Sequence, residues 1–336
     1  MIDLKRHRYI EPVAQKWQGW VCDYFYTIKT SKERPWLTTI AGRVYFNTYA
    51  EKLRYQLNGA VHSYVKGNGA LEKRLQILTR LFLIRFKVVV LASPTLLDIL
   101  VHAIKRRVRQ PKRLIGMIKD VIVPYYEAVS KEYGYNLVKE LCIKTCPYCN
   151  RQFIHSFQAI RTERPELDHF YPKAYYPFFC LSFYNLIPVC HSCNHVKLED
   201  EMGVNPYNRA FNSKFVITDK AGKKLSHSKI YKLTEKEINI KLDGKNAEEE
   251  KNSQVLGLED VYCKHADYVK ELIDKSMAYD TYARRALVEC FQGAGYHPRQ
   301  VYDFVWGRHL MDAEYEDHPL SKLTKDVIDL LGIKRG

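Results

Sequence analysis

Two pairs of cysteines with the spacing Cys-x-x-Cys constrain this 336-residue chain more than any other feature. The pairs are Cys146/Cys149 and Cys190/Cys193, with 40 residues between them. The short spacing lets both sulfurs of a pair face one ion from a tight turn, and four thiolates suit tetrahedral zinc. The long gap must hold structure of its own. A single pair would fit redox chemistry or coincidence equally well, but two pairs around one Asp-His dipeptide favour a structural zinc site.

That acid–histidine dipeptide is Asp168-His169, between the two cysteine pairs. The segment Glu166–Phe170 predicts a short strand, preceded by Pro165 and ended by Tyr171-Pro172. Neighbouring residues of a strand face opposite ways, so Asp168 could bind a metal ion while His169 activates water nearby. Phosphodiester hydrolysis needs a divalent cation and a base, and neutral imidazole suits the second task near pH 7. The alternative is a carboxylate that only orients a histidine in a loop.

The order of these residues resembles the HNH, or ββα-metal, endonuclease family in its zinc-stapled form. That family has a strand ending in Asp-His, a loop, a second strand with Asn, and a helix that carries the last metal ligand. The matching residues are Asp168-His169, Asn185-Leu186 and Cys190-x-x-Cys193-Asn194-x-x-Lys197. The resemblance implies that His169 is the general base and Asp168 a ligand of the catalytic metal. It also implies that Asn185 holds the loop backbone and orients His169.

The last ligand departs from the commonest form of the family, in which a histidine directly follows the second cysteine pair. Asn194 stands in that place and His195 follows it, and one step along a helix turns the side chain by about 100°. The family's variant with an asparagine ligand makes Asn194 the expected ligand and His195 the alternative. Oxygen ligands favour Mg²⁺ or Mn²⁺, whereas a histidine would favour softer ions such as Zn²⁺ or Ni²⁺. Lys197 stands where the family often has a basic residue near the phosphate; an exposed helix lysine is the alternative.

This resemblance covers residues 140–210, about a fifth of the chain. The segments His169–Lys173 and Ser182–Leu186 also resemble the corresponding motifs of bacterial HNH proteins from anti-phage and restriction systems, including those associated with retrons and with Septu. That closer resemblance implies a role in defence. By analogy, it also implies a partner such as a regulatory ATPase or another defence-system protein. The chain has no G-x-x-x-x-G-K-[ST] motif, so it supplies no ATPase motor of that type.

Positive charge is concentrated before the cysteine-rich stretch. The formal net charge is +15, and residues 1–140 hold 25 Lys and Arg against 11 Asp and Glu. A basic surface on one part of a chain is typical of nucleic-acid binding through the phosphate backbone. The densest basic run predicts a phosphate contact, with a solvated helix end as the equal alternative. Its basic residues are Lys105, Arg106, Arg107, Arg109, Lys112 and Arg113.

Residues 1–139 therefore predict a basic, helical domain that binds nucleic acid or a partner. Residues 1–47 mix aromatic with basic side chains; such aromatics can stack on splayed bases, but a place in the core is the favoured interpretation. From 49 to 133 apolar residues recur at helical spacing, and Ser93-Pro94 predicts a helix N-terminus.

Residues 211–336 predict a C-terminal α+β region that is mostly helical. Strands are expected at 214–218 and 238–242, helices from 255 to 291, and a short amphipathic helix at 323–331. With the nuclease module at 140–210, the expected fold is mainly α. It has a central ββα-metal, treble-clef-like module and a small β-rich segment after it.

The sequence also predicts a cytoplasmic protein without a membrane partner. The chain begins without a signal-peptide profile, and its most apolar stretch, 81–91, is short and interrupted by Arg85 and Lys87. Nine cysteines, four of them assigned to zinc, fit a reducing compartment, and the other five are interpreted as small core residues or free thiols.

Taken together, these features predict a metal-dependent endonuclease that hydrolyses phosphodiester bonds, with DNA favoured although no residue separates DNA from RNA. His169 would be the base, and Asp168 and Asn194 would hold one Mg²⁺ or Mn²⁺. Two alternatives stay open: a non-catalytic zinc module that binds nucleic acid, and an adaptor whose zinc knuckles scaffold a partner surface. Neither alternative needs the Asp168-His169 pair.

Overall fold

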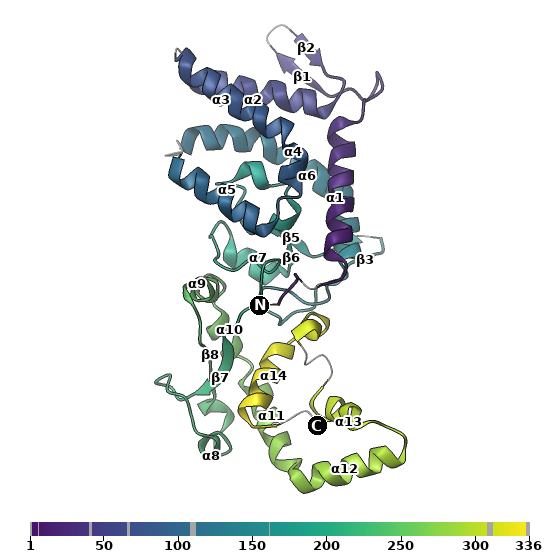
Figure 1. The fold of residues 1–336 in the computed structure, drawn as a ribbon, viewed down its shortest axis with the longest axis vertical. Coiled ribbons are helices and arrows are strands. Elements are labelled where there is room, and N and C mark those ends of the chain that lie inside the picture. Colours follow the sequence, from purple (N-terminus) through teal and green to yellow (C-terminus); the bar gives the residue numbers. More distant parts are fainter. Residues whose placement is uncertain are drawn as a thin grey trace.

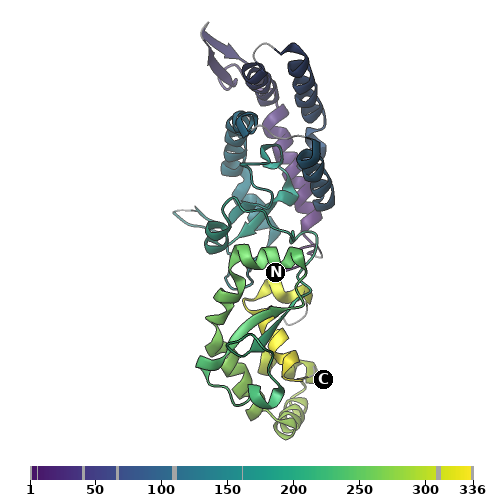
Figure 2. The same cartoon turned by 90° about the vertical axis from the view of Figure 1, so that its left-hand side faces the viewer.

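The computed structural model describes residues 2–5, 7–39, 42–65, 68–107, 112–160, 162–307 and 312–333. These residues are mainly helical, with four two-stranded antiparallel sheets, which confirms the expected fold class at this coarse level. The molecule is elongated, and the same long axis is seen in two perpendicular views (Figures 1 and 2). The N-terminal helices fill one end, the cysteine-rich stretch lies in the middle, and the C-terminal elements fill the other end.

The helices of the first half and middle are α1 (Ile10–Tyr26), α2 (Tyr49–Val65), α3 (Gly69–Ile84), α4 (Phe86–Val90), α5 (Pro94–Arg107), α6 (Lys112–Leu141) and α7 (His191–Lys197). Those that follow are α8 (His227–Ile230), α9 (Ala247–Leu256), α10 (Leu258–Cys263), α11 (Ala266–Ala278), α12 (Thr281–Gly293), α13 (Pro298–Trp306) and α14 (Ser321–Leu330). Short 3₁₀ helices are η1 (Pro177–Phe179), η2 (Phe183–Asn185), η3 (Glu235–Glu237) and η4 (Asp312–Asp317).

The strands pair in sequence order. They are β1 (Trp36–Thr39) with β2 (Gly42–Tyr45), β3 (Phe157–Gln158) with β4 (Thr162–Glu163), β5 (Glu166–His169) with β6 (Leu186–Val189), and β7 (Lys214–Thr218) with β8 (Asn239–Asp243). β7 lies as predicted, and β8 is shifted by one residue from the expected strand.

Helix α1 connects the first half of the chain to the middle. Its buried residues recur at three- and four-residue steps from Ile10 to Phe25, as expected of a helix with one apolar face. At its centre the fully buried Trp17 donates its indole N–H to the Leu181 carbonyl oxygen (2.9 Å), in the loop between β5 and β6. The segment before α1 also reaches the middle, because the N–H of Ile2 donates to the Pro147 carbonyl (2.9 Å) inside the first cysteine pair.

The predicted features of the first half are partly seen. The Ser93 hydroxyl accepts a hydrogen bond from the N–H of Leu96 (3.3 Å) at the start of α5, as an N-cap should. Trp17 and Phe25 are buried in the core, but Trp36 and Tyr45 are exposed on β1 and β2. The expected domain boundary between residues 139 and 140 falls inside α6, which ends at Leu141.

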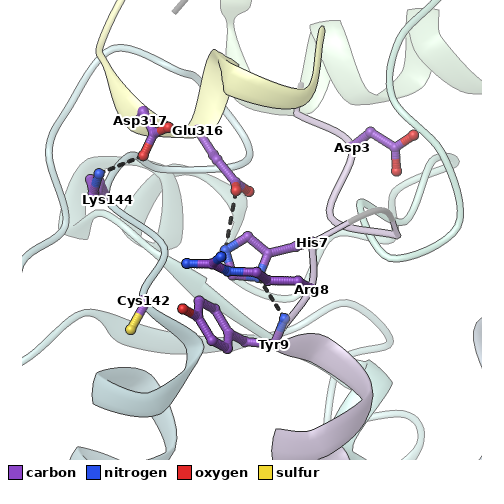
Figure 3. A pocket seen from close by; sticks show the side chains of 8 residues that line it. All are labelled: Asp3, His7, Arg8, Tyr9, Cys142, Lys144, Glu316 and Asp317. Atoms are coloured by element: carbon purple, nitrogen blue, oxygen red, sulfur yellow. Dashed lines mark hydrogen bonds and ion pairs between the residues drawn. The ribbon is translucent and has the colours of Figure 1, made fainter.

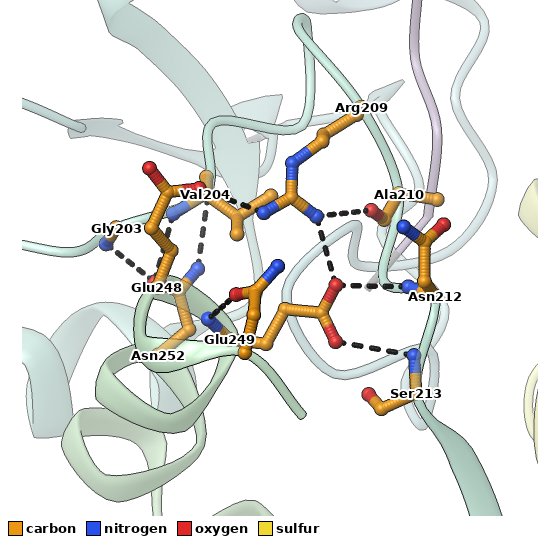
Figure 4. Close-up of polar contacts among 10 residues, drawn as sticks. Gly203, Val204, Arg209, Ala210, Asn212, Ser213, Glu248, Glu249 and Asn252 are labelled. Atoms are coloured by element: carbon orange, nitrogen blue, oxygen red, sulfur yellow. Dashed lines mark hydrogen bonds and ion pairs between the residues drawn. The ribbon is translucent and has the colours of Figure 1, made fainter. Parts of the chain in front are cut away.

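Hydrogen bonds join helix α9 to residues 203–213, which follow the cysteine-rich stretch (Figure 4). The buried Asn252 amide accepts hydrogen bonds from the N–H groups of Gly203 (2.6 Å) and Val204 (3.0 Å). A side chain at position 203 would come within 2.6 Å of the Glu248 backbone, so the close approach requires glycine. The fully buried Glu249 carboxylate accepts a hydrogen bond from the Arg209 guanidinium (2.8 Å). The contacts of Asn252 and Glu249 hold the C-terminal half of the chain against the cysteine-rich middle.

Among the described residues, no helix combines the length and apolar character that crossing a membrane would need.

Candidate functional site

The four paired cysteines converge on one buried cluster. The ligand atoms of Cys146, Cys149, Cys190 and Cys193 all lie within 4.8 Å of one another, and the Sγ atoms of Cys149 and Cys190 are 3.9 Å apart. Sulfurs bound to one tetrahedral zinc ion at about 2.3 Å are separated by about 3.8 Å. The cluster could therefore hold a metal ion such as zinc, as the spacing predicted. The other five cysteines have free thiols.

Different local structures present the two pairs. After Cys146 the chain turns sharply: the N–H of Asn150 donates to the Cys146 carbonyl (2.7 Å), and Asn150 has a φ of 49°. Asparagine adopts this left-handed conformation more readily than most residues. Cys190 precedes the first residue of α7, so the second pair lies at a helix N-terminus. One pair thus depends on a turn and the other on β6 running into α7.

Strands β5 and β6 pair beside the cysteines, and helix α7 follows β6 directly and contacts β5. Asp168 pairs with Ile187 and His169 with Leu186, so the acid–histidine pair lies at the end of β5. The predicted strand at this position is therefore present.

Asp168 is a buried carboxylate with both oxygens in hydrogen bonds. Oδ2 accepts a hydrogen bond from the Tyr148 hydroxyl (2.6 Å), and Oδ1 accepts one from the Lys197 ammonium (3.1 Å). Tyr148 lies within the first cysteine pair and Lys197 ends α7, so a residue close to each pair reaches Asp168. Burial raises the pKa of the Asp168 carboxyl, and the positive charge of Lys197 opposes that rise. A carboxylate has about four lone-pair sites, so these contacts leave room for a cation.

His169 is held on the other side of the strand. Its Nε2 lies 3.0 Å from the Cys180 carbonyl oxygen, and its ring packs against Tyr126 of α6 with centroids 4.5 Å apart. A carbonyl oxygen only accepts, so Nε2 carries the hydrogen and Nδ1 keeps a lone pair. No hydrogen bond to another described residue occupies Nδ1. Burial lowers the pKa of His169 to about 3, so the ring is neutral at neutral pH.

Asn185 fastens the loop between β5 and β6. Its fully buried amide accepts the N–H of Tyr171 (2.7 Å) and donates to the carbonyls of Tyr171 (3.1 Å) and Phe179 (3.0 Å). The Cys180 carbonyl that holds His169 follows directly after Phe179. Asn185 therefore fixes the loop segment that orients the imidazole.

On α7, Asn194 and His195 point in different directions. Asn194 lines a pocket with Asp168 and His169, whereas His195 is exposed and packs beside His191, with ring centroids 5.8 Å apart. The Asn194 amide N–H donates to Oε2 of Glu166 (2.5 Å), which leaves the amide oxygen free to serve as a ligand. Of the two residues considered for the last ligand, the geometry favours Asn194.

The pocket between these residues has a volume of about 170 Å³. It is lined by Tyr126, Leu167, Asp168, His169, Pro172, Lys173, Ala174, Asn194, Leu198 and Glu199. The Lys173 ammonium lies over the Tyr126 ring, 5.2 Å from its centroid, and 3.8 Å from Oε1 of Glu127. Lys173 is thus the lysine that faces this pocket from the described residues.

Lys197 does not lie where the resemblance placed it. Its side chain is fully buried, and its ammonium donates to Asp168 and to the carbonyl oxygen of His169 (2.8 Å). A buried ammonium paired with a buried carboxylate is an internal counterion and cannot touch a phosphate at the surface. Residues three apart lie on the same face of a helix, so Asn194 and Lys197 share one face of α7. Asn194 lines the pocket, and Lys197 contacts Asp168 and the backbone of His169.

The described residues of the predicted basic run lie in two environments. Lys105 pairs with Glu201 (2.5 Å), and Tyr176 donates to the other oxygen of the same carboxylate (2.5 Å). Arg106 and Arg107 end α5, but their side chains, like all of Arg109, lie outside the described residues. Lys112 and Arg113 are exposed in the first turn of α6, which has no acidic residue.

Several contributors were not predicted, namely Tyr148, Glu166, Lys173 and the Cys180 carbonyl. Glu166 could have been found, because it lies two positions before Asp168 and therefore on the same face of the strand. Lys173 and Cys180 belong to an irregular loop, where sequence spacing carries no information about direction.

A larger cavity, of about 380 Å³, lies where the N-terminal segment meets the end of α6 and η4 (Figure 3). Four of its titratable side chains form two contacts: His7 Nε2 lies 3.1 Å from Glu316 Oε1, and Lys144 Nζ lies 2.6 Å from Asp317 Oδ1. Burial raises the pKa of Glu316 to about 7 and lowers that of His7. This cavity shares no residue with the pocket at Asp168, and its two contacts join the N-terminal segment and the end of α6 to η4.

Comparison with known proteins adds no relative: no family model matches the sequence, and no curated protein or solved structure matches it significantly. Function must therefore be argued from the site itself.

Proposed function

We propose that this protein is a metal-dependent endonuclease of the zinc-stapled HNH type, which hydrolyses phosphodiester bonds and has DNA as its favoured substrate. The observation that carries the proposal is the meeting of three groups at one pocket: the neutral imidazole of His169, the carboxylate of Asp168 and the amide oxygen of Asn194. They come from a strand end and a helix that the cysteine cluster joins. A module that only binds nucleic acid has no use for this combination.

His169 would act as the general base. The Cys180 carbonyl fixes the tautomer with a hydrogen on Nε2, so Nδ1 can take a proton from water. Burial disfavours the protonated ring in the free protein. A bound phosphodiester brings negative charge next to the ring and would favour the imidazolium as the proton is transferred. Asn185 would act as a positioning residue, because it fixes the loop that carries the Cys180 carbonyl.

The oxygen donors fit a hard divalent cation such as Mg²⁺ or Mn²⁺. Asp168 would offer the remaining lone-pair site of its carboxylate, and Asn194 would offer its amide oxygen. When bound, such an ion neutralises charge on the scissile phosphate and on the leaving oxygen. Lys173, which also lines the pocket, would contact the phosphate, the role first assigned to Lys197.

Zinc in the four-cysteine cluster would have a structural role. Tyr148 and Lys197, which lie beside the two cysteine pairs, both hydrogen bond to Asp168. Loss of the ion would therefore disturb the catalytic carboxylate as well as the fold of the module.

The same proposal includes a cytoplasmic role in bacterial anti-phage defence or restriction, with a regulatory ATPase or other defence-system protein as partner. This part rests on the resemblance of the sequence segments around His169 and Asn185 to HNH proteins of bacterial defence systems. Co-purification with a neighbouring gene product would support it, and full activity of the isolated chain would count against a required partner.

The test is nicking of supercoiled plasmid by zinc-loaded protein, with Mg²⁺ or Mn²⁺ and with EDTA added just before the assay. We expect cleavage that stops in EDTA and falls by a factor of about 10² to 10⁴ in His169→Ala, the range for loss of a general base. The matched control is His195→Ala, since that histidine is exposed and turned away from the pocket. Equal activity of both variants would refute the assignment of the base.

A further inference from the structure

The hairpin formed by β1 and β2 carries exposed aromatic and basic side chains on one face. Trp36 is 44% exposed and Tyr45 is 54% exposed, and the two residues are directly opposite each other in the sheet. Thr38 and Arg43 are the next opposed pair on the same face, and both are exposed. The residues of the other face, such as Leu37 and Val44, are half-buried. The hairpin therefore turns its large aromatics toward solvent and its smaller apolar residues inward.

The exposed face has the composition of a stacking surface. The Arg43 guanidinium lies over the Trp36 ring, 4.4 Å from its centroid, so a planar cation extends a planar ring. Stacking of a base on aromatic rings and on guanidinium planes is the general way in which proteins hold unpaired nucleotides. Burying these aromatics in the core would have been the expected fate of residues 1–47, and Trp17 and Phe25 follow it.

The charge around the hairpin also suits a polyanion. Lys32, Arg34 and Arg54 are exposed, and none of them forms an ion pair with a described residue. Their charges are therefore available, in contrast to that of Lys105, which Glu201 neutralises. Cations that follow a groove or ribbon bind the phosphates, while the aromatics take the bases.

We infer that this face of the hairpin, formed by Trp36, Thr38, Arg43 and Tyr45, binds single-stranded nucleic acid by stacking on its bases. The hairpin lies at the end of the molecule far from α7 (Figure 1). A strand held there would be anchored away from the pocket at Asp168. The inference does not depend on the cleavage chemistry, because binding to the hairpin can be measured without any cleavage.

The test measures anisotropy of labelled oligo(dT), oligo(rU) and a duplex of equal length, with the full chain carrying His169→Ala and no added divalent cation. Adding Trp36→Ala and Tyr45→Ala should weaken binding of the single strands at least tenfold, because each stacked base contributes about 1–3 kcal/mol. Binding of the duplex, whose bases are already stacked, should change less than twofold. The matched control is Tyr282→Ala, an aromatic 82% exposed on α12, and it should leave all three affinities unchanged.

Two further readouts separate base stacking from purely electrostatic binding and from dimer formation. Trp36→Phe should keep most of the affinity while removing the fluorescence quenching that oligo(dT) causes, which would place the ring against a base. Sedimentation at several concentrations reports on a second copy of the chain: a dimer that disappears in the hairpin variant, with unchanged affinity for oligonucleotides, overturns the inference. So does an equal loss for duplex and single strand, or an equal loss in Tyr282→Ala.

Discussion

The two candidate metal sites of this protein are built in opposite ways. In the four-cysteine cluster the ligand sulfurs all lie within 4.8 Å of one another, so they could bind the same ion. At the pocket, the oxygens of Asp168 and the amide of Asn194 already bind protein groups, namely Tyr148, Lys197 and Glu166. The cysteine cluster therefore has the arrangement of ligands around one ion, whereas protein groups already hold the side chains at the pocket.

The difference indicates different roles. Uncompensated thiolates packed together need a permanent cation, which suits a structural ion that joins two distant segments. The Asp168 carboxylate can keep its position without a metal, because the buried Lys197 ammonium balances its charge. Under the proposed function, such a site would take up an exchangeable cation together with substrate. The hydrogen bond from Tyr148 to Asp168 connects the two sites, so the segment that carries the first cysteine pair also positions the Asp168 carboxylate.

The largest effect should come from removing one cysteine ligand. Cys193→Ser should abolish folding of the middle of the chain, since structural zinc contributes about 10 kcal/mol or more in small zinc domains. Zinc content and circular dichroism would measure the loss. Cys290→Ser, at an exposed cysteine of α12, is the matched control and should behave as wild type. A Cys193→Ser protein with normal zinc content and stability would remove the distinction between the two sites.

The next effect should come from the internal counterion. Lys197→Met leaves the buried Asp168 carboxylate without a positive partner, and breaking a buried pair in this way costs about 3–5 kcal/mol. Urea unfolding of the zinc-loaded protein measures this cost. Adding Asp168→Asn to Lys197→Met removes the stranded charge and should restore part of the stability. If the double variant is no more stable than Lys197→Met, the ammonium does not act as the counterion of Asp168.

A smaller effect should follow from cutting the connection between the sites. Tyr148→Phe removes the hydroxyl that donates to Asp168, and loss of one hydrogen bond to a buried group costs about 1–3 kcal/mol. Because Asp168 is then less well positioned, the Mn²⁺ concentration needed for half-maximal cleavage should rise while zinc content stays normal. An unchanged Mn²⁺ requirement would show that the two sites are independent.

The smallest effect on stability should come from Lys173, a half-buried lysine that lines the pocket. Lys173→Gln should change the free energy of unfolding by no more than about 0.5 kcal/mol, as is usual for surface positions. Its expected effect is on substrate: KM for DNA should rise about tenfold with little change in kcat. Lys144→Gln, whose ammonium pairs with Asp317 outside the pocket, is the control. A loss of stability without a change in KM would assign Lys173 a structural role.

Sequence reasoning succeeded where spacing determines geometry. The four cysteines, the strand at Asp168 and the helix at Ser93-Pro94 all follow from local patterns that fix direction as well as type. It failed for Lys197, because a lysine on a short helix is expected at the surface, and only tertiary packing reveals the buried carboxylate that holds it. Lys173 was missed for the complementary reason, since its loop has no periodicity.

The exposed aromatics of the hairpin teach the same lesson. Residues 1–47 contain aromatic side chains that sequence alone assigns to the core, and for α1 this is correct because the helix has one apolar face. In a two-residue-period ribbon, alternate side chains must face opposite ways, and Trp36 and Tyr45 are on the outward face. Which face is outward depends on what packs behind it, and no local pattern contains that information.

The most direct test of the account is a Mn²⁺ titration of zinc-loaded protein, followed by electron paramagnetic resonance, with wild type and Asp168→Asn compared. We predict that wild type binds one exchangeable Mn²⁺ while retaining its zinc, that cleavage of plasmid follows occupancy of this site, and that Asp168→Asn loses the Mn²⁺ site but keeps the zinc. Equal Mn²⁺ binding by both proteins, or Mn²⁺ that binds only by displacing zinc, would contradict the division into one structural and one catalytic site.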